Sequence, residues 1–355
     1  MNIKERNSSF ELVKILAIFC IVICHSIPTE RIEYHFATSD TWLFLIILLR
    51  QMGSVGNAIF MVASTWFLVD SDNTSFKKVK NMIADNQLIS LLFLSVMFFI
   101  YTISIKEVIK QVFPFLFATL WYITCYVVYY CLHGLVNRAL QNIKINNFIP
   151  VVFVIFYLLF AFVLGGLYFT DLVGFIMIHV LTWYIKKILN SRIHKSRFGL
   201  GFIIFMIGLL GWIFGAVVFN YLGLRIDGIG DKLHYWNRFY NPFILLIAYG
   251  LIILSSSVKS HSVIINKISG LSLYIYIFTG NQLLRYYTDN YLYDYYSASF
   301  GNSMRLCFVF VLLYAIVKLL LGVFLSVIYK YTIRRIIKII VDKECGFYKK
   351  VLFNR

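Results

Sequence analysis

The sequence predicts an all-α membrane protein, and both its composition and the spacing of its apolar residues support this class. The chain of 355 residues is 60% hydrophobic, only 14% of its residues are charged, and its mean hydropathy is +0.79. The surface of a soluble protein carries more charge than that. The apolar residues also form runs long enough to cross a hydrocarbon core of about 30 Å as helices. We therefore expect a polytopic membrane protein.

About ten such runs follow one another, and each is expected to form one transmembrane helix. Pro114, Pro150 and Pro242 stand at the starts of three runs, where the first turn of a helix tolerates proline. No repeat or long linker divides the chain, so residues 1–355 are expected to form a single domain. The runs are residues 10–27, 42–69, 82–103, 113–135, 148–164, 167–184, 198–222, 239–258, 268–284 and 306–329.

The basic residues predict the orientation, because Lys and Arg collect in short cytoplasmic loops. When the amino terminus is placed in the cytoplasm, most of the 33 Lys and Arg residues fall on that side. Both termini are therefore expected in the cytoplasm of a multi-pass plasma-membrane protein. Residues 330–355 are expected to form a basic amphipathic tail on the inner leaflet. Topology and lipid explain the net charge of +17, so no nucleic-acid partner is predicted.

The six cysteines predict neither a metal site nor a disulfide framework. They lie mostly inside apolar runs and lack the spacing of metal ligands. We interpret them as small packing residues.

The first run carries its ionisable residues on one face. Lys14 and His25 lie eleven residues apart, which at 100° per residue returns to within about 20° of the same direction, and Glu11 lies close to that line. Ionisable groups in hydrocarbon are costly unless they face other helices or water, so this face is expected to point into the bundle. With an ordinary pKa of about 6.5, the His25 imidazole has the chemistry of a general base. The alternative is a packed, hydrogen-bonded histidine at the membrane interface.

The second run also has a polar face. Arg50, Ser54, Asn57 and Ser64 recur at helical spacing within an otherwise apolar segment. For Ser54 and Ser64 the alternative is ordinary hydrogen bonding between closely packed helices. A buried arginine requires a carboxylate, a cluster of carbonyls or an anionic ligand beside it, which makes Arg50 a site candidate.

Two motifs carry a resemblance to a known family. One is a basic residue, ten residues and a histidine, from Lys14 to His25; the other is the basic-x-x-basic spacing of Lys77 and Lys80 in FLVDSDNTSFKKVKNMI. Both resemble the acyltransferase-3 family of membrane acyltransferases, whose bacterial members O-acetylate cell-surface polysaccharides. The likeness extends over most of the predicted helices, through GNAIFMVASTWFLV at 56–69, LWYITCYVVYY at 120–130, YNPFILLIAYGLIIL at 240–254 and LSLYIYIFTG at 271–280.

The sequence departs from the family pattern at four places. Thr65, Thr119 and Thr279 stand where the family has a glycine or a histidine, so no role is assigned to them. The basic pair is lysine instead of arginine, which keeps the charge but loses the bidentate fork for phosphate.

The resemblance implies a membrane O-acyltransferase that transfers an acyl group, acetyl or succinyl, from acyl-CoA to a hydroxyl of a cell-surface or lipid-linked polysaccharide. It implies His25 as the catalytic base, and we nominate Arg50 to stabilise the oxyanion. Acetyl-CoA is expected as the co-substrate, with no metal. Glu11, Ser54 and Asn57 are expected to support the site. The donor-binding candidates are Lys14, Lys77, Lys78 and Lys80, although an ordinary positive-inside loop explains the last three equally well.

Two other functions stay open on the sequence alone. An exporter or flippase for a polysaccharide or lipid-linked glycan also needs many helices, a polar cavity and outer aromatic residues, such as the six tyrosines of RYYTDNYLYDYYS at 285–297. It does not need one essential histidine together with a donor-binding lysine cluster. A structural subunit of a polysaccharide synthase needs neither of these features.

Overall fold

The computed structural model describes residues 6–27, 37–144, 148–164, 171–190, 194–230, 236–300 and 303–335. In these parts of the chain all regular structure is helical. Of the predicted basic tail, residues 336–355 lie outside the described residues. The long helices are α1 (Ser8–His25), α2 (Thr41–Leu68), α3 (Phe76–Phe98), α5 (Trp121–Gln141), α6 (Ile149–Leu164), α7 (Asp171–Asn190), α8 (His194–Gly223), α10 (Pro242–Ser257) and α14 (Met304–Ile328).

The shorter helices of the described chain, apart from the one at Ile105–Val112, lie in its carboxyl-terminal part. They include two π-helical segments, η2 (Leu284–Asp289) and η3 (Tyr329–Ile333), which continue directly into or out of α-helices. The remaining short helices are α4 (Ile105–Val112), α11 (Val263–Ser269), α12 (Ser272–Gly280) and α13 (Asn290–Phe300).

Six helices of the described chain are long and apolar enough to cross a membrane: α1, α2, α3, α7, α8 and α14. A seventh crossing results if α11 and α12, which meet at a bend of 42°, are counted as one span. The helix α10 is apolar but has 16 residues, about 24 Å at 1.5 Å per residue. Each of the ten predicted runs contains helix, so the helical class is confirmed, while the crossings beyond these seven stay predictions.

The two largest shifts from the predicted helix starts are at α3 and α5. Turns occupy residues 113–120, where Ala118 has a φ of 46°, so α5 begins at Trp121 and Pro114 lies before it. The helix α3 begins at Phe76 because Ser75 caps it: the Ser75 hydroxyl accepts a hydrogen bond from the Lys78 backbone nitrogen. The lysines predicted in a loop therefore lie on the first turns of a helix.

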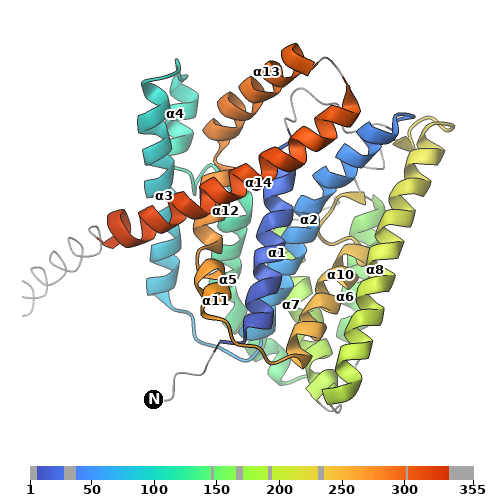
Figure 1. Ribbon diagram of the computed structural model, residues 1–355. Coiled ribbons are helices and arrows are strands. Elements are labelled where there is room, and N and C mark those ends of the chain that lie inside the picture. The colour runs from blue at the N-terminus through green and yellow to red at the C-terminus, as the bar shows by residue number, and fades with distance from the viewer. Residues whose placement is uncertain are drawn as a thin grey trace, which may run out of the picture.

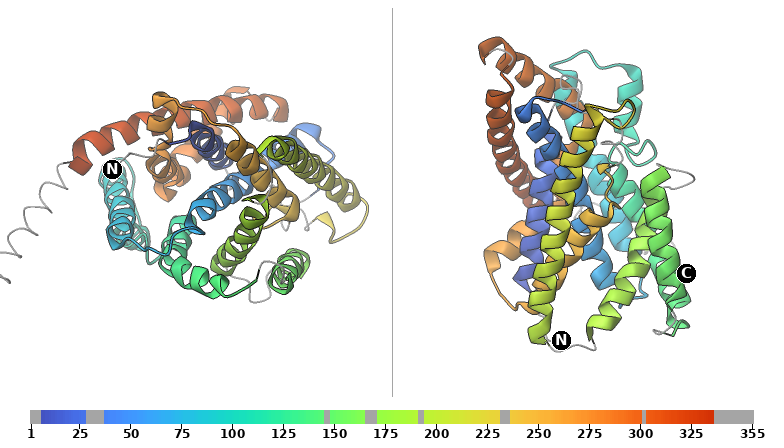
Figure 2. Two further views of the ribbon diagram at one scale, coloured as in Figure 1. Left: turned by 90° about the horizontal axis from the view of Figure 1, so that it is seen from below. Right: turned by 90° about the vertical axis from the view of Figure 1, so that its right-hand side faces the viewer.

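The first helix lies at the centre of the bundle. It contacts α2, α10, α11, α12 and α14, and Figure 1 shows α14 crossing it obliquely. Seen along the bundle, α8 packs on α10 to one side, and α3 stands on the other (Figure 2). We call the end that holds the starts of α1 and α3 the lysine end, and the opposite end, where α1 stops near η2, the histidine end. This arrangement surrounds His25 with helices from distant parts of the chain.

Candidate active site

The helix α1 ends at His25, and its neighbours leave the imidazole with an unused nitrogen. The Ser26 hydroxyl bonds back to the carbonyl of Val22, 2.8 Å away, and so closes the last turn. The residue is half-buried, and its Nδ1 atom is buried without a hydrogen-bond partner among the described residues. The Tyr276 ring lies 5.9 Å from the imidazole, centroid to centroid. A buried, unsatisfied ring nitrogen is costly, and so marks a position where a ligand group is expected.

Gly280, the last residue of α12, forms one wall of the histidine site. A Cβ atom at this position would lie 3.1 Å from the His25 Cε1 atom and 3.4 Å from Nδ1. The absence of a side chain therefore lets the backbone of α12 approach the imidazole. A methyl group there would press on the ring at the unused nitrogen.

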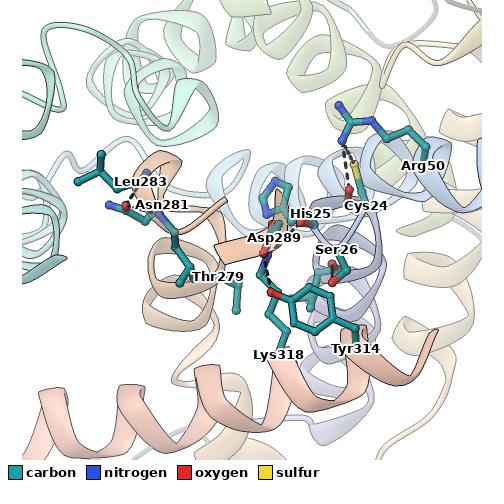
Figure 3. Close-up of polar contacts among 12 residues, drawn as sticks. Cys24, His25, Ser26, Arg50, Thr279, Asn281, Leu283, Asp289, Tyr314 and Lys318 are labelled. Atoms are coloured by element: carbon teal, nitrogen blue, oxygen red, sulfur yellow. Dashed lines mark hydrogen bonds and ion pairs between the residues drawn. The ribbon is translucent and has the colours of Figure 1, made fainter. Parts of the chain in front are cut away.

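Arg50 reaches the end of α1 from α2. Its Nη1 atom donates to the Cys24 carbonyl and to the Cys24 Sγ atom, both at 3.1 Å (Figure 3). Two glycines allow this approach: a Cβ at Gly53 would lie 2.5 Å from the Cys24 Sγ atom, and one at Gly56 would lie 2.5 Å from the Ala17 carbonyl oxygen. Carbonyl groups were one of the three kinds of partner expected for Arg50. The contact with Cys24 places the guanidinium next to the residue that precedes His25.

A buried ion pair that the sequence analysis missed supports the same helix end. The Lys318 Nζ atom lies 2.7 Å from Asp289 Oδ2 and donates to the His25 carbonyl at 3.0 Å. The Tyr314 hydroxyl donates to the other Asp289 oxygen at 2.5 Å, as Figure 3 shows. The Lys318 and Asp289 side chains are 4% and 3% exposed. A single lysine inside the apolar α14 was the available signal, because such a residue requires a partner.

Three cations lie close enough to the imidazole for their charges to act on it: Arg285, Lys318 and Arg50. Lys318 is neutralised by Asp289, whereas Arg285 forms no ion pair within the described chain. The surroundings of His25 therefore carry an excess of positive charge. Such an excess stabilises negative charge that develops beside the ring.

A cavity of about 640 Å³ opens at the histidine end. Ile27, two residues beyond His25, lies in its wall together with η2 and the start of α4. The lining is mainly polar and holds hydroxyl, amide and charged groups. The lining residues are Ile27, Thr102, Ser104, Glu107, Lys110, Gln282, Leu283, Arg285, Tyr286, Tyr287, Asp289 and Asn290.

A second cavity, of about 220 Å³, leads from Lys78 near the lysine end to Tyr276. Because the Tyr276 ring also faces His25, this residue stands between the second cavity and the imidazole. Tyr122 and Ser272 line the same cavity, and their buried hydroxyls have no hydrogen-bond partner in the part of the chain that the structure describes. The cavity therefore has an apolar wall with a few polar groups, a composition typical of small-molecule sites.

The family of acyltransferase domains termed acyltransferase 3 matches residues 7–331. The chain belongs to this family. The predicted resemblance is thus confirmed over nearly the whole chain, and the protein is a membrane acyltransferase. Comparison with curated proteins and with solved structures finds no match.

The predicted donor lysines of this acyltransferase-3 protein do not form one cluster. Lys78 lines the second cavity, with its Nζ atom 4.5 Å from the centre of the Tyr130 ring, and Lys14 lies near enough for the two charges to interact. Lys77 and Lys80 are exposed and do not line the cavity. Helix geometry explains the separation, since neighbouring positions on α3 point in different directions.

Glu11 and Lys14 form an ion pair with each other, one turn apart on α1. The Lys14 Nζ atom lies 3.1 Å from Glu11 Oε1, and the Ser269 hydroxyl donates to the other Glu11 oxygen. Glu11 is therefore buried between α1 and α11. It holds Lys14 in place at the lysine end.

The supporting residues on α2 have separate surroundings. The Ser54 hydroxyl donates to the Asn237 carbonyl at 2.8 Å and so packs α2 against the segment before α10. The Asn57 Oδ1 atom is buried without a hydrogen-bond partner in the described chain. Their support of the site stays a prediction.

The three departures from the family pattern are buried threonines. The Thr65 hydroxyl bonds to Thr182 at 3.0 Å, while those of Thr119 and Thr279 bond to backbone carbonyls. All three side chains are therefore satisfied by packing partners.

Within the described ranges, no group of three His, Cys, Asp or Glu side chains is arranged to hold a metal ion.

Proposed function

We propose that this protein is an O-acyltransferase of the plasma membrane that transfers an acetyl group from acetyl-CoA to a hydroxyl of a cell-surface or lipid-linked polysaccharide. The observation that carries the proposal is the buried Nδ1 atom of His25, which has no hydrogen-bond partner among the described residues. Ile27, two residues further on, lines one cavity, and Tyr276, whose ring lies 5.9 Å from the imidazole, lines the other. One cavity faces the lysine end and the other faces the histidine end. Two substrates that enter from opposite sides would meet at this imidazole.

The lysine end suits the acyl donor. An acyl-CoA carries phosphates, which Lys78 and Lys14 would hold as point charges. Lys14 and His25 are about 16 Å apart along α1 at 1.5 Å per residue, which is comparable to an extended pantetheine arm. The arm would pass Tyr122 and Ser272, whose unused hydroxyls have hydrogen-bonding capacity for its amides. The thioester would then lie beside Tyr276 and His25.

The reaction follows from this placement. His25 takes the proton of the acceptor hydroxyl while that oxygen forms a bond to the thioester carbonyl carbon. The carbonyl oxygen becomes an oxyanion, which Arg50 would stabilise. When the carbon–sulfur bond breaks, the thiolate leaves and receives the proton from the imidazolium. The products are the ester and free CoA, and the imidazole is neutral again.

The proposal includes the topology expected from the basic residues. Ten crossings with both termini in the cytoplasm would place the lysine end at the cytoplasmic face, where acyl-CoA is made. The histidine end would then face the outside, where the glycan lies. The start of α3 at Phe76 supports this arrangement, because Lys78 lies at the same end of the bundle as Lys14.

The test is the chemistry of the surface glycan in cells that lack the gene. Complementation with the wild type is compared with His25→Ala and with His261→Ala, a control at an exposed residue. Mass spectrometry before and after mild base identifies the esters, because base removes esters and leaves glycosidic bonds. We expect normal amounts of glycan without esters in the deletion and in His25→Ala cells. Glycan retained inside the cell would overturn the proposal in favour of an exporter.

A further inference from the structure

Among the charged residues that line the 640 Å³ cavity at the histidine end, Arg285 is the one without an ion-pair partner in the described chain. Glu107 is bound by Lys110 at 2.7 Å. Asp289 is bound by Lys318 and by the Tyr314 hydroxyl. Arg285 forms no ion pair with any described residue, and its Nε atom is buried without a hydrogen-bond partner. Both carboxylates in the cavity wall, Glu107 and Asp289, therefore already have a lysine partner, whereas the Arg285 guanidinium has no carboxylate partner.

The neighbours of Arg285 do not compensate for its charge. Arg50 lies close enough to repel it, and Asp289, the acid that attracts it, is shared with Lys318. A partly buried cation without a partner is expensive, so a site of this kind is stabilised by an anion from outside the chain. A planar guanidinium with five donors matches a carboxylate or a phosphate.

The rest of the cavity wall suits a sugar. Gln282, Asn290, Thr102 and Ser104 bring amides and hydroxyls to the wall. Tyr287 also lines it, and its ring is stacked on Tyr101 at 4.4 Å. Aromatic faces next to hydrogen-bonding side chains give a wall with both apolar and polar contacts for a saccharide.

We propose that Arg285 binds an anionic group of the acceptor, so that the preferred acceptor is an acidic saccharide bearing a carboxylate or a phosphate close to the acylated hydroxyl. This deepens the proposed function and rests on it. Arg285 lies close enough to His25 for its charge to act on the imidazole, so a sugar whose anionic group is held by this guanidinium would lie near the ring. The charge on the acceptor thereby selects which hydroxyl meets the base.

Binding is tested first, because it does not depend on catalysis. The purified full-length protein in detergent is titrated calorimetrically with two matched pairs: trehalose 6-phosphate against trehalose, and a glucuronosyl-glucose disaccharide against cellobiose. We expect at least one charged member to bind roughly tenfold more tightly than its neutral partner, with Arg285→Gln removing roughly ten- to hundredfold of that affinity. Arg285→Lys should fall between the two proteins, and Lys106→Gln, an exposed cation on α4, should resemble the wild type.

Several outcomes would overturn the site. One is that the wild type binds charged and neutral sugars equally tightly. Another is that Arg285→Gln weakens the binding of both members of a pair equally, which would make Arg285 a general binding group or an oxyanion-stabilising group. If only phosphatidylglycerol nanodiscs, compared with phosphatidylcholine nanodiscs, raise the unfolding temperature in an Arg285-dependent way, the occupant is a lipid headgroup. Acetyl transfer from radiolabelled acetyl-CoA is measured afterwards. Arg285-dependent sugar binding without any transfer would leave this site standing and overturn the proposed function.

Discussion

Two of the histidines that lie between helices, His25 and His179, have opposite surroundings. His179, on α7, uses both ring nitrogens: Nδ1 lies 2.5 Å from the Tyr129 hydroxyl and Nε2 lies 2.7 Å from Asn137 Oδ1. Because the Asn137 oxygen only accepts, the proton is on Nε2, and one tautomer is locked. His25 has a buried Nδ1 atom with no partner among the described residues. Both ring nitrogens of His179 thus join helices, whereas Nδ1 of His25 is left for the proposed contact with substrate.

The contrast extends to the residues behind each ring. Around His179, the hydrogen bonds continue from Asn137 to the carbonyls of Leu68 and Ser71, which joins α5, α7 and the end of α2. Around His25, the hydrogen bonds are made to backbone carbonyls and not to the imidazole. Lys318 donates to the His25 carbonyl, and Arg50 donates to the Cys24 carbonyl. The polar groups of the histidine end thus position the helix end that carries His25, the proposed base.

The largest difference is expected from the same substitution at the two histidines. His25→Leu should lower the rate of CoA release in the presence of acceptor by about 10²–10⁴-fold, the usual contribution of a general base, with little change in unfolding temperature. His179→Leu should instead destabilise the protein by about 1–3 kcal/mol, because it leaves the Tyr129 hydroxyl and the Asn137 oxygen unsatisfied. Rates per folded molecule and thermal unfolding in detergent measure the two effects. An inactive but stable His179→Leu protein would break the comparison.

Breaking the ion pair behind His25 is expected to have the next largest effect. Lys318→Met leaves the Asp289 carboxylate buried without its cation and should destabilise the fold by about 3–5 kcal/mol. The double variant Lys318→Met/Asp289→Asn removes both charges and should recover much of this stability. Its turnover should stay low, since the His25 carbonyl has lost its donor.

The double variant thus separates stability from positioning. Full recovery of both stability and turnover would show that the pair serves the fold alone. The measurements are denaturation in detergent and kcat with the acceptor at saturation.

A smaller effect is expected at the wall of the site. Gly280→Ala adds a methyl group 3.1 Å from the His25 Cε1 atom and should lower kcat about tenfold by displacing the ring. Gly199→Ala is the control, because nothing lies within 4 Å of a Cβ at that position. Unchanged turnover in Gly280→Ala would mean that the orientation of the imidazole is not critical.

The smallest effect is expected on the KM for acetyl-CoA, which should distinguish Lys78 from Lys77 on α3. Lys78→Gln should raise the KM for acetyl-CoA by about three- to tenfold, as expected for the loss of one charged contact to a phosphate at a partly exposed site. Lys77→Gln, a neighbouring exposed lysine, should leave KM unchanged, because its side chain does not line the cavity. Equal effects from the two variants would favour a diffuse cytoplasmic charge over a defined donor site.

Much of the helical plan was predictable because it depends on local patterns. Apolar runs predicted where helices form, and the α1 face with Lys14 and His25 follows from the helical repeat alone. Boundaries were less certain where capping decides them: Ser75 extends α3 back to Phe76, and the turns at 113–120 delay α5. The sequence predicted several donor-binding lysines on α3, whereas only Lys78 of these lines the cavity. The spacing of residues along a chain does not say which of them faces a cavity.

The sequence by itself determined that the chain is helical and apolar enough to cross a membrane repeatedly, and that one histidine shares a helix face with a lysine. Those properties depend on residues within a few turns of each other. The tertiary structure decided what surrounds that histidine. Lys318 is 293 residues from His25 in sequence, and it meets Asp289 only because η2 and α14 pack against the end of α1. A buried charge needs a partner, but only folding chooses which one, because that choice depends on helices brought together from distant parts of the chain.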